Sequence, residues 1–251
     1  MLKTRWILFA LVLWLVFVIT RIPASWGAWL MTQNGVLALS GVSGTLWSGK
    51  AGMASASIDG KDYSLGELRW TLHPASLLTL SPCADISTEL EYQQASGTAC
   101  ASLGGQLHLK NTDISAPASL VQGIAPNTRL DGRASVQIAE LRLNGQHLDA
   151  LKGNLNWTGA RVHNGQNWLN VGSFAADLSA TPEGHINADI FSLEGPIDLA
   201  GNVIMPLAGG IFINAEFAFT PAFAREVQAD QWLPMIAEPL ANGKHKLEMQ
   251  L

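Results

Sequence analysis

The first pattern along the chain is an unbroken apolar run from Trp6 to Thr20, fifteen residues without a charge. Lys3 and Arg5 precede this run and Arg21 follows it. Its terminal position and basic flank favour a membrane anchor or a secretory signal. Extended by two residues, the run reaches the lower end of the length of a spanning helix, about 17 to 25 residues. We predict a transmembrane signal anchor over residues 6–22; a cleaved signal and a soluble core helix are the alternatives.

The distribution of basic residues predicts the orientation of this anchor. Two cations and the amino terminus precede the run and one cation follows it, so residues 1–5 are expected in the cytoplasm. The remainder is then outside the cytoplasm. Residues 23–35 form a membrane-proximal segment in which Trp26 and Trp29 lie three apart, and tryptophan is enriched at membrane surfaces.

From residue 36 onward the pattern changes to an alternation of apolar and polar residues. Leu68, Trp70 and Leu72 alternate with polar residues, and a similar strand is predicted from Ile86 to Tyr92, followed by a turn at 95–97. A period of two residues is typical of strands that have one apolar face. The same signature recurs through most of the remaining chain.

These short strands predict a mainly β, antiparallel domain over residues 36–251, either a curved sheet or a sandwich. The apolar parity shifts by one residue near Ala139, which predicts a β-bulge or a strand break. A short helix is predicted near the C-terminus, from Ala222 to Trp232. The prolines of 116–126 suggest a boundary between two similar halves.

The charge of the chain excludes one large class of partner. The net charge is −5; without the three cations at the anchor, 12 basic and 20 acidic residues remain, a net charge of −8. An acidic exported domain is a poor candidate for binding nucleic acid.

The chain has two cysteines, Cys83 and Cys100. An even number of cysteines in an oxidising compartment favours a disulfide between them. Two buried free thiols are the alternative. A metal site is not expected, because neither a close second thiol nor a pair of histidines accompanies them.

Motifs for catalysis or cofactor binding were sought and not found. The stretch from Gly44 to Ala51 nearly matches a phosphate-binding loop, but Ala51 lacks the hydroxyl that holds magnesium, and strand-like residues follow where a helix is needed. The histidines are scattered, and no G-x-S-x-G motif is present. We therefore expect no enzyme activity, no nucleotide, no metal and no other cofactor. Trp47, Trp70 and Trp157 are interpreted as structural residues.

At these same residues the sequence resembles protein N of the bacterial type II secretion system. The resemblance covers nearly the whole chain in order after an N-terminal anchor, and it is carried by three stretches: VSGTLWSGKA (42–51), LGELRWTLHPASLL (65–78) and LDGRASVQIAELRLNGQHLDALKGNLNWTGARV (130–162). It implies a single-pass inner-membrane protein with a periplasmic β-rich domain. It further implies an accessory role in protein export across the outer membrane through contacts with other secretion components, and it supplies no catalytic residues.

A second hypothesis is a lipid-binding or lipid-transfer protein of the envelope. A curved sheet with one apolar face forms a groove for acyl chains, and the Leu- and Ala-rich alternating strands permit this as well as protein contacts. A periplasmic hydrolase is a third class, and no motif supports it.

Overall fold

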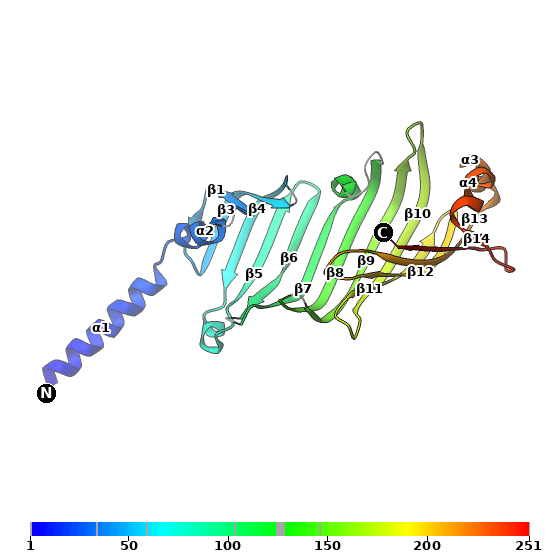
Figure 1. Cartoon of the computed structure of the whole chain (residues 1–251). Helices are drawn as coiled ribbons and strands as arrows, with labels where there is room; N and C mark the ends of the chain where they lie inside the picture. Colours follow the sequence, from blue (N-terminus) through cyan, green and yellow to red (C-terminus); the bar gives the residue numbers. More distant parts are fainter. Residues whose placement is uncertain are drawn as a thin grey trace. The chain divides into compact units, whose positions relative to one another are not determined.

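The computed structural model describes residues 2–33, 35–58, 60–102, 104–123, 129–145 and 147–250. Backbone contacts separate two compact units, Met1–Ser102 and Leu103–Leu251, here called unit 1 and unit 2. Antiparallel β-strands dominate both units, as predicted, and Figure 1 shows the elements along the chain.

Unit 1 begins with two helices and continues as a β-sheet. Its elements are α1 (Leu2–Thr20), α2 (Ala24–Thr32), β1 (Leu37–Ser40), β2 (Ser43–Gly44), β3 (Ser48–Ile58), β4 (Lys61–Leu72), the 3-10 helix η1 (Pro74–Thr79), β5 (Cys83–Leu90) and β6 (Gln93–Ala101). The strand order is β1-β3-β4-β5-β6, and β2 also pairs with β3.

Unit 2 is a longer sheet in which almost every strand pairs with the strand that follows it. Its elements are β7 (Gln106–Pro117), η2 (Ala118–Gly123), β8 (Arg129–Asn144), β9 (His147–His163), β10 (Trp168–Ala180), β11 (Ile186–Glu194), β12 (Ile197–Met205), β13 (Phe212–Phe219), α3 (Pro221–Glu226), α4 (Ala229–Ile236), β14 (Glu238–Pro239) and β15 (His245–Gln250). The order is β7-β8-β9-β10-β11-β12-β13-β15-β14.

Each unit is an open single sheet, so the sandwich alternative is wrong. No large side chain among the described residues is buried to below 2% exposure, because no second sheet covers the first. Small clusters provide what core there is: Ala51, Ala54 and Leu68 in unit 1, and two clusters under α3 and α4 in unit 2.

The N-terminal helix forms where the apolar run predicted it but ends earlier. α1 stops at Thr20, because Pro23 follows and disfavours helical backbone in the residue before it. Among the described residues, no helix is both long and apolar enough to cross a membrane. The transmembrane helix predicted over residues 6–22 is thus not confirmed: at 1.5 Å per residue, the apolar run rises by about 22 Å, against a hydrocarbon core of about 30 Å.

The bulge predicted near Ala139 is confirmed. The β8–β9 register shifts between Ile138 and Glu140, which restores the apolar side chains to one face. The C-terminal helix is present but divided into α3 and α4, because Gln228 between them adopts a left-handed φ of 52°.

One predicted position is wrong. The turn expected at 95–97 lies instead at 91–92, where Glu91 has φ 40°, and 95–97 belong to β6. The two compact units divide after Ser102. The boundary expected within 116–126 stays a prediction, and residues 124–126 lie outside the described residues. The strands β7 and β8, on either side of these residues, pair with each other from Gln106↔Asn144 to Pro117↔Arg133. Similarity between two halves stays a prediction.

Gly172 offers a direct test of how closely these strands pack. It has φ 106° at a register shift in β10, and a Cβ there would collide with the carbonyl oxygen of Glu194. Gly165 has φ 95° in a hairpin turn, and a Cβ there would meet nothing within 4 Å. Comparing a substitution at each glycine therefore distinguishes the cost of backbone strain alone from the added cost of steric overlap.

We predict that Gly165→Ala lowers the free energy of unfolding by about 1–2 kcal/mol, the cost of the left-handed conformation. Gly172→Ala should cost a further ~1–3 kcal/mol, because β10 and β11 must also move apart. Chemical denaturation of the full chain measures both changes. Equal losses would contradict the packing described for Gly172.

Candidate functional site

The sheet of unit 2 has one apolar and one polar face, and the strand register shows how far each extends. Residues paired across neighbouring strands share a face. Each strand from β7 to β13, and then β15, contributes one residue to a continuous apolar row: Ile114, Val136, Leu155, Ala176, Ile190, Gly201, Ala215 and Leu247.

A second, largely apolar row runs beside the first on the same face. Its members are Thr112, Ile138, Gly153, Leu178, Ala188, Val203, Ile213 and Met249. At about 4.8 Å between strands, each row crosses roughly 34 Å of sheet. We call the two rows together the apolar face.

The opposite surface carries a row made only of carboxylate and amide side chains. Its members are Asp113, Gln137, Asn154, Asp177, Asp189, Asn202, Asn214 and Glu248. Asn202 donates from Nδ2 to Asp189 Oδ1 at 2.7 Å, which offsets part of the repulsion between Asp189 and the directly opposite Asp177. This polar face is therefore suited to contact with water.

Among the residues that the structure describes, the apolar face is covered at the end under α4. Phe217, two residues beyond Ala215 on the same side of β13, packs against Leu233 of α4 in a cluster that includes Leu199 and Leu247. Elsewhere the large side chains of both rows are half-buried, and Ile114 and Met249 are 40% and 37% exposed. A monomeric soluble protein rarely leaves a continuous apolar surface of this extent uncovered. The apolar face is therefore the candidate functional site.

The three tryptophans predicted to be structural all donate their indole N–H to backbone carbonyl groups. In unit 1, Trp47 Nε1 donates to the Ile19 oxygen at 2.8 Å, and Trp70 Nε1 donates to Leu46 at 3.1 Å. In unit 2, Trp157 Nε1 donates to the Asp131 oxygen at 3.1 Å. None of the three is fully buried. Trp70 in β4 and Trp157 in β9 each join a strand to a segment far along the chain, while Trp47 joins the turn between β2 and β3 to α1.

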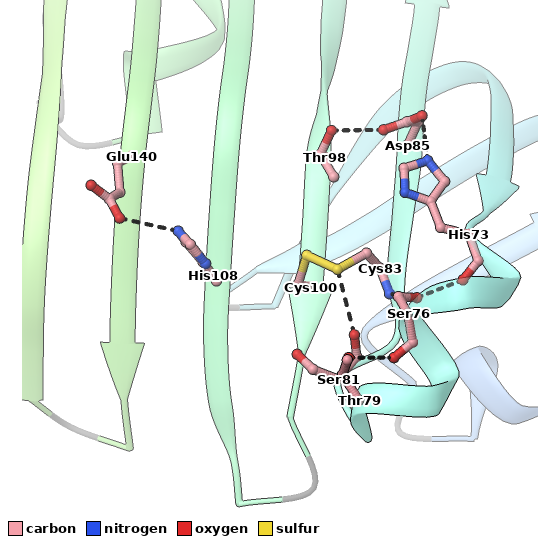
Figure 2. Close-up of a disulfide and its surroundings, with 10 residues drawn as sticks. All are labelled: His73, Ser76, Thr79, Ser81, Cys83, Asp85, Thr98, Cys100, His108 and Glu140. Atoms are coloured by element: carbon pink, nitrogen blue, oxygen red, sulfur yellow. Dashed lines mark hydrogen bonds and ion pairs between the residues drawn. A yellow bond between two sulfur atoms is a disulfide. The ribbon is translucent and has the colours of Figure 1, made fainter.

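Cys83 and Cys100 are joined by a disulfide between directly paired residues of β5 and β6, with Cα atoms 4.0 Å apart (Figure 2). On the same strands, Asp85 accepts hydrogen bonds from Thr98 Oγ1 at 2.6 Å and from His73 Nε2 at 2.8 Å. These bonds, with Thr98 contributing most, lower the pKa of the Asp85 carboxyl. The group is a surface network at one end of the unit 1 sheet.

No catalytic arrangement is found among the residues that the structure describes. No group of three or more His, Cys, Asp or Glu side chains is placed to hold a metal ion. The residues from Gly44 to Ala51 form strands β2 and β3 and the turn between them, not the loop and helix that a phosphate site needs. The carboxyl pKa values that are lowered belong to exposed groups, such as Glu67 beside Arg69.

The sequence alone indicated the apolar side of each strand but not the continuous apolar face. Alternation assigns residues to a side within one strand, whereas a continuous face requires the register between strands. The sequence feature most informative about this face is the shift in apolar parity at Ala139, because it shows that β8 keeps its apolar residues on one side through a bulge.

We predict that replacing both cysteines with alanine lowers the free energy of unfolding by about 3 kcal/mol, because the bond closes a 17-residue separation in the unfolded chain. Denaturation of the parent with and without reductant should reproduce the same loss. A double variant as stable as the oxidised parent would show that the strand pairing alone holds β5 to β6.

Residues 36–248 match the family described as type II secretion system, protein N. The chain is 24% identical to type II secretion system protein N of Aeromonas hydrophila over 96% of this chain and 94% of the relative. It is 27% identical to the protein of the same name from Vibrio cholerae serotype O1, over 57% of each chain. No solved structure matches the chain.

Proposed function

The chain belongs to the family of type II secretion system protein N, and from that premise we propose that it is an accessory subunit that acts by binding other secretion components in the periplasm. The observation that carries this proposal is the apolar face. Burying half-exposed apolar side chains contributes about 25 cal/mol per Å² of area removed from water. A partner that covers this face would supply the second layer that unit 2 lacks.

The sheet edge offers a second mode of contact with the same kind of partner. β14 pairs with β15 only at Glu238↔Lys246 and Pro239↔His245. In the described part of the chain, Leu247–Gln250 therefore have a strand neighbour on the β13 side alone. An extended segment of a partner can add to such an edge through backbone hydrogen bonds.

The disulfide and α1 support a location in the cell envelope. Disulfides persist in the periplasm and are rare in the cytosol. All the large apolar residues from Trp6 to Ile19 are between 39% and 67% exposed, so α1 is apolar on every side and requires an apolar surrounding. We propose that α1 inserts into the inner membrane with the N-terminus in the cytoplasm and the β-rich units in the periplasm.

The short length of the apolar run sets a condition on this insertion. Lys3 and Arg5 on one side and Arg21 on the other must reach the two headgroup layers, and the bilayer must thin locally. Arg21 already lies beside the run, with its guanidinium 5.4 Å from the centre of the Phe17 ring.

Lipid binding is the second candidate function, favoured by the composition of the same face. Gly153, Ala176, Ala188, Gly201 and Ala215 place small side chains along both rows, between the branched ones. An acyl chain lies readily on a surface of this kind. The two candidates predict different results for the same pair of variants.

Val136 and Gln137 are neighbours on β8 that lie on opposite faces of the sheet. In cells lacking the parent chain, we predict that Val136→Glu fails to restore secretion, while Gln137→Glu restores it. We expect about tenfold less secreted protein from Val136→Glu, because a carboxylate buried against an apolar partner would be an unpaired charge. The measurement is the fraction of exported enzyme in the medium rather than trapped in the periplasm.

Both variants should form the disulfide and keep the β-sheet content of the parent, because neither residue is fully buried. Full secretion by the folded Val136→Glu variant would reject the apolar face as the binding surface. Normal secretion in cells without the chain would reject the accessory role itself.

The lipid candidate predicts that purified Gln137→Glu retains more phospholipid or glycolipid than purified Val136→Glu, measured by mass spectrometry after extraction. The comparison is needed because α1 itself retains lipid from the membrane. Equal lipid content in the two variants, together with a secretion defect in Val136→Glu alone, would eliminate the lipid candidate and leave the protein partner.

A further inference from the structure

The segment between β4 and β5 in unit 1 is an apolar tip that neither the secretion role nor the apolar face of unit 2 uses. Residues 74–82, PASLLTLSP, carry no charge and include η1. Leu77, Leu78 and Leu80 are 39%, 88% and 63% exposed. Leu78 is the most exposed large apolar side chain in the described part of the chain. We call residues 74–82 the η1 tip.

Local hydrogen bonds hold the η1 tip in one conformation. Ser76 Oγ donates to the His73 oxygen at 2.6 Å and accepts from the backbone N–H of Cys83 at 2.8 Å, so this one hydroxyl joins both ends of the tip. The backbone N–H of Leu80 donates to the Leu77 oxygen at 3.1 Å. The disulfide fixes Cys83 to β6 directly after the tip, as Figure 2 shows.

Leu80 adopts a backbone conformation that its side chain disfavours. Its φ is 54°, in the left-handed region that suits glycine or asparagine. If the backbone conformation alone decided the residue at this position, a small or polar residue would be favoured. Leucine at this position adds apolar surface at the end of the tip.

The η1 tip lies at the same end of the unit 1 sheet as the end of α1. Trp47 connects the two: its indole donates to the Ile19 oxygen at 2.8 Å, and its backbone oxygen accepts from the Leu72 N–H at 2.7 Å. Leu72 ends β4, and the tip begins two residues later. The backbone N–H of Leu46 also donates to the Ile22 oxygen at 2.9 Å.

Exposed tryptophans follow on α2, which begins four residues after α1 ends. Ala24 and Ala28 form the buried side of α2, while Trp26 and Trp29 are 72% and 67% exposed. Arg21 directly follows α1, and at the base of the tip Asp85 accepts a hydrogen bond from His73. The η1 tip and α2 therefore expose leucine and tryptophan, and the tip itself carries no charge.

We propose that the η1 tip inserts its leucines into the surface of the phospholipid bilayer that holds α1. An uncharged tip enters this interface without removing an ion from water, and exposed leucine and tryptophan gain by leaving water. Contact at both α1 and the tip fixes the tilt of the unit 1 sheet over the membrane. The proposal rests on the membrane insertion of α1 proposed above.

The test uses the full chain in vesicles of phosphatidylethanolamine and phosphatidylglycerol, with the photoreactive residue p-benzoylphenylalanine replacing Leu78. Tyr92 is the matched control position, because it is 68% exposed in the turn at the opposite end of β5. After illumination, mass spectrometry measures lipid adducts. We expect about tenfold more adduct at 78 than at 92, a preference of about 1.4 kcal/mol.

The photoreactive residue at a third position distinguishes failure of the tip to insert from failure of α1 to insert. Replacement of Val12 within α1 should give lipid adducts whenever the helix is inserted. Adducts at 12 with none above the control at 78 would overturn the tip while leaving the anchor intact. Absence at 12 as well would overturn both. In cells, crosslinks from 78 to a protein in place of lipid would also overturn the proposal.

The disulfide provides a further readout. With Cys83→Ser and Cys100→Ser combined, the tip loses its fixed base, and adducts at 78 should fall toward the level at 92 while those at 12 stay unchanged. The disulfide of the Leu78-replaced chain, seen as a mobility shift on reduction, shows that the replacement leaves the fold intact. An unchanged yield at 78 without the disulfide would show that the bond does not position the tip.

Discussion

The hydrogen-bonded pairing of neighbouring strands is the interaction on which both units depend. In a two-layer protein, packing between layers fixes the position of each strand, and an error in register is corrected by the core. Here each sheet is a single layer, and no large side chain in the described residues is fully buried. The hydrogen bonds between paired strands therefore hold most of the structure together, and the register between strands decides which face of the sheet each side chain lies on.

This dependence explains which predictions from the sequence were right. Alternation in β4 and β8 is local, so the strands and the bulge at Ala139 followed from the residues themselves. The apolar run also gave the helix α1. The family resemblance added an export role that no single residue encodes.

What the sequence did not predict depends on features that the local pattern does not contain. The turn between β5 and β6 contains Glu91 and Tyr92, with no glycine, so a turn placed by glycine was assigned to the interior of β6 instead. The prolines of 116–126 suggest a linker, and the local pattern does not reveal that β7 and β8 pair with each other. The apolar face requires pairing between many strands, which the pattern within one strand does not contain.

The single-layer construction also has a consequence for how such a protein changes over evolution. Each strand of unit 2 contacts little beyond its two neighbours, as in a repeat protein whose stability is a sum of nearest-neighbour terms. Inserting or deleting one hairpin, about 10 Å of sheet, would lengthen or shorten the apolar face while leaving the remaining strands as they are. Relatives can thus adjust the reach of this surface in hairpin steps, without redesigning a core.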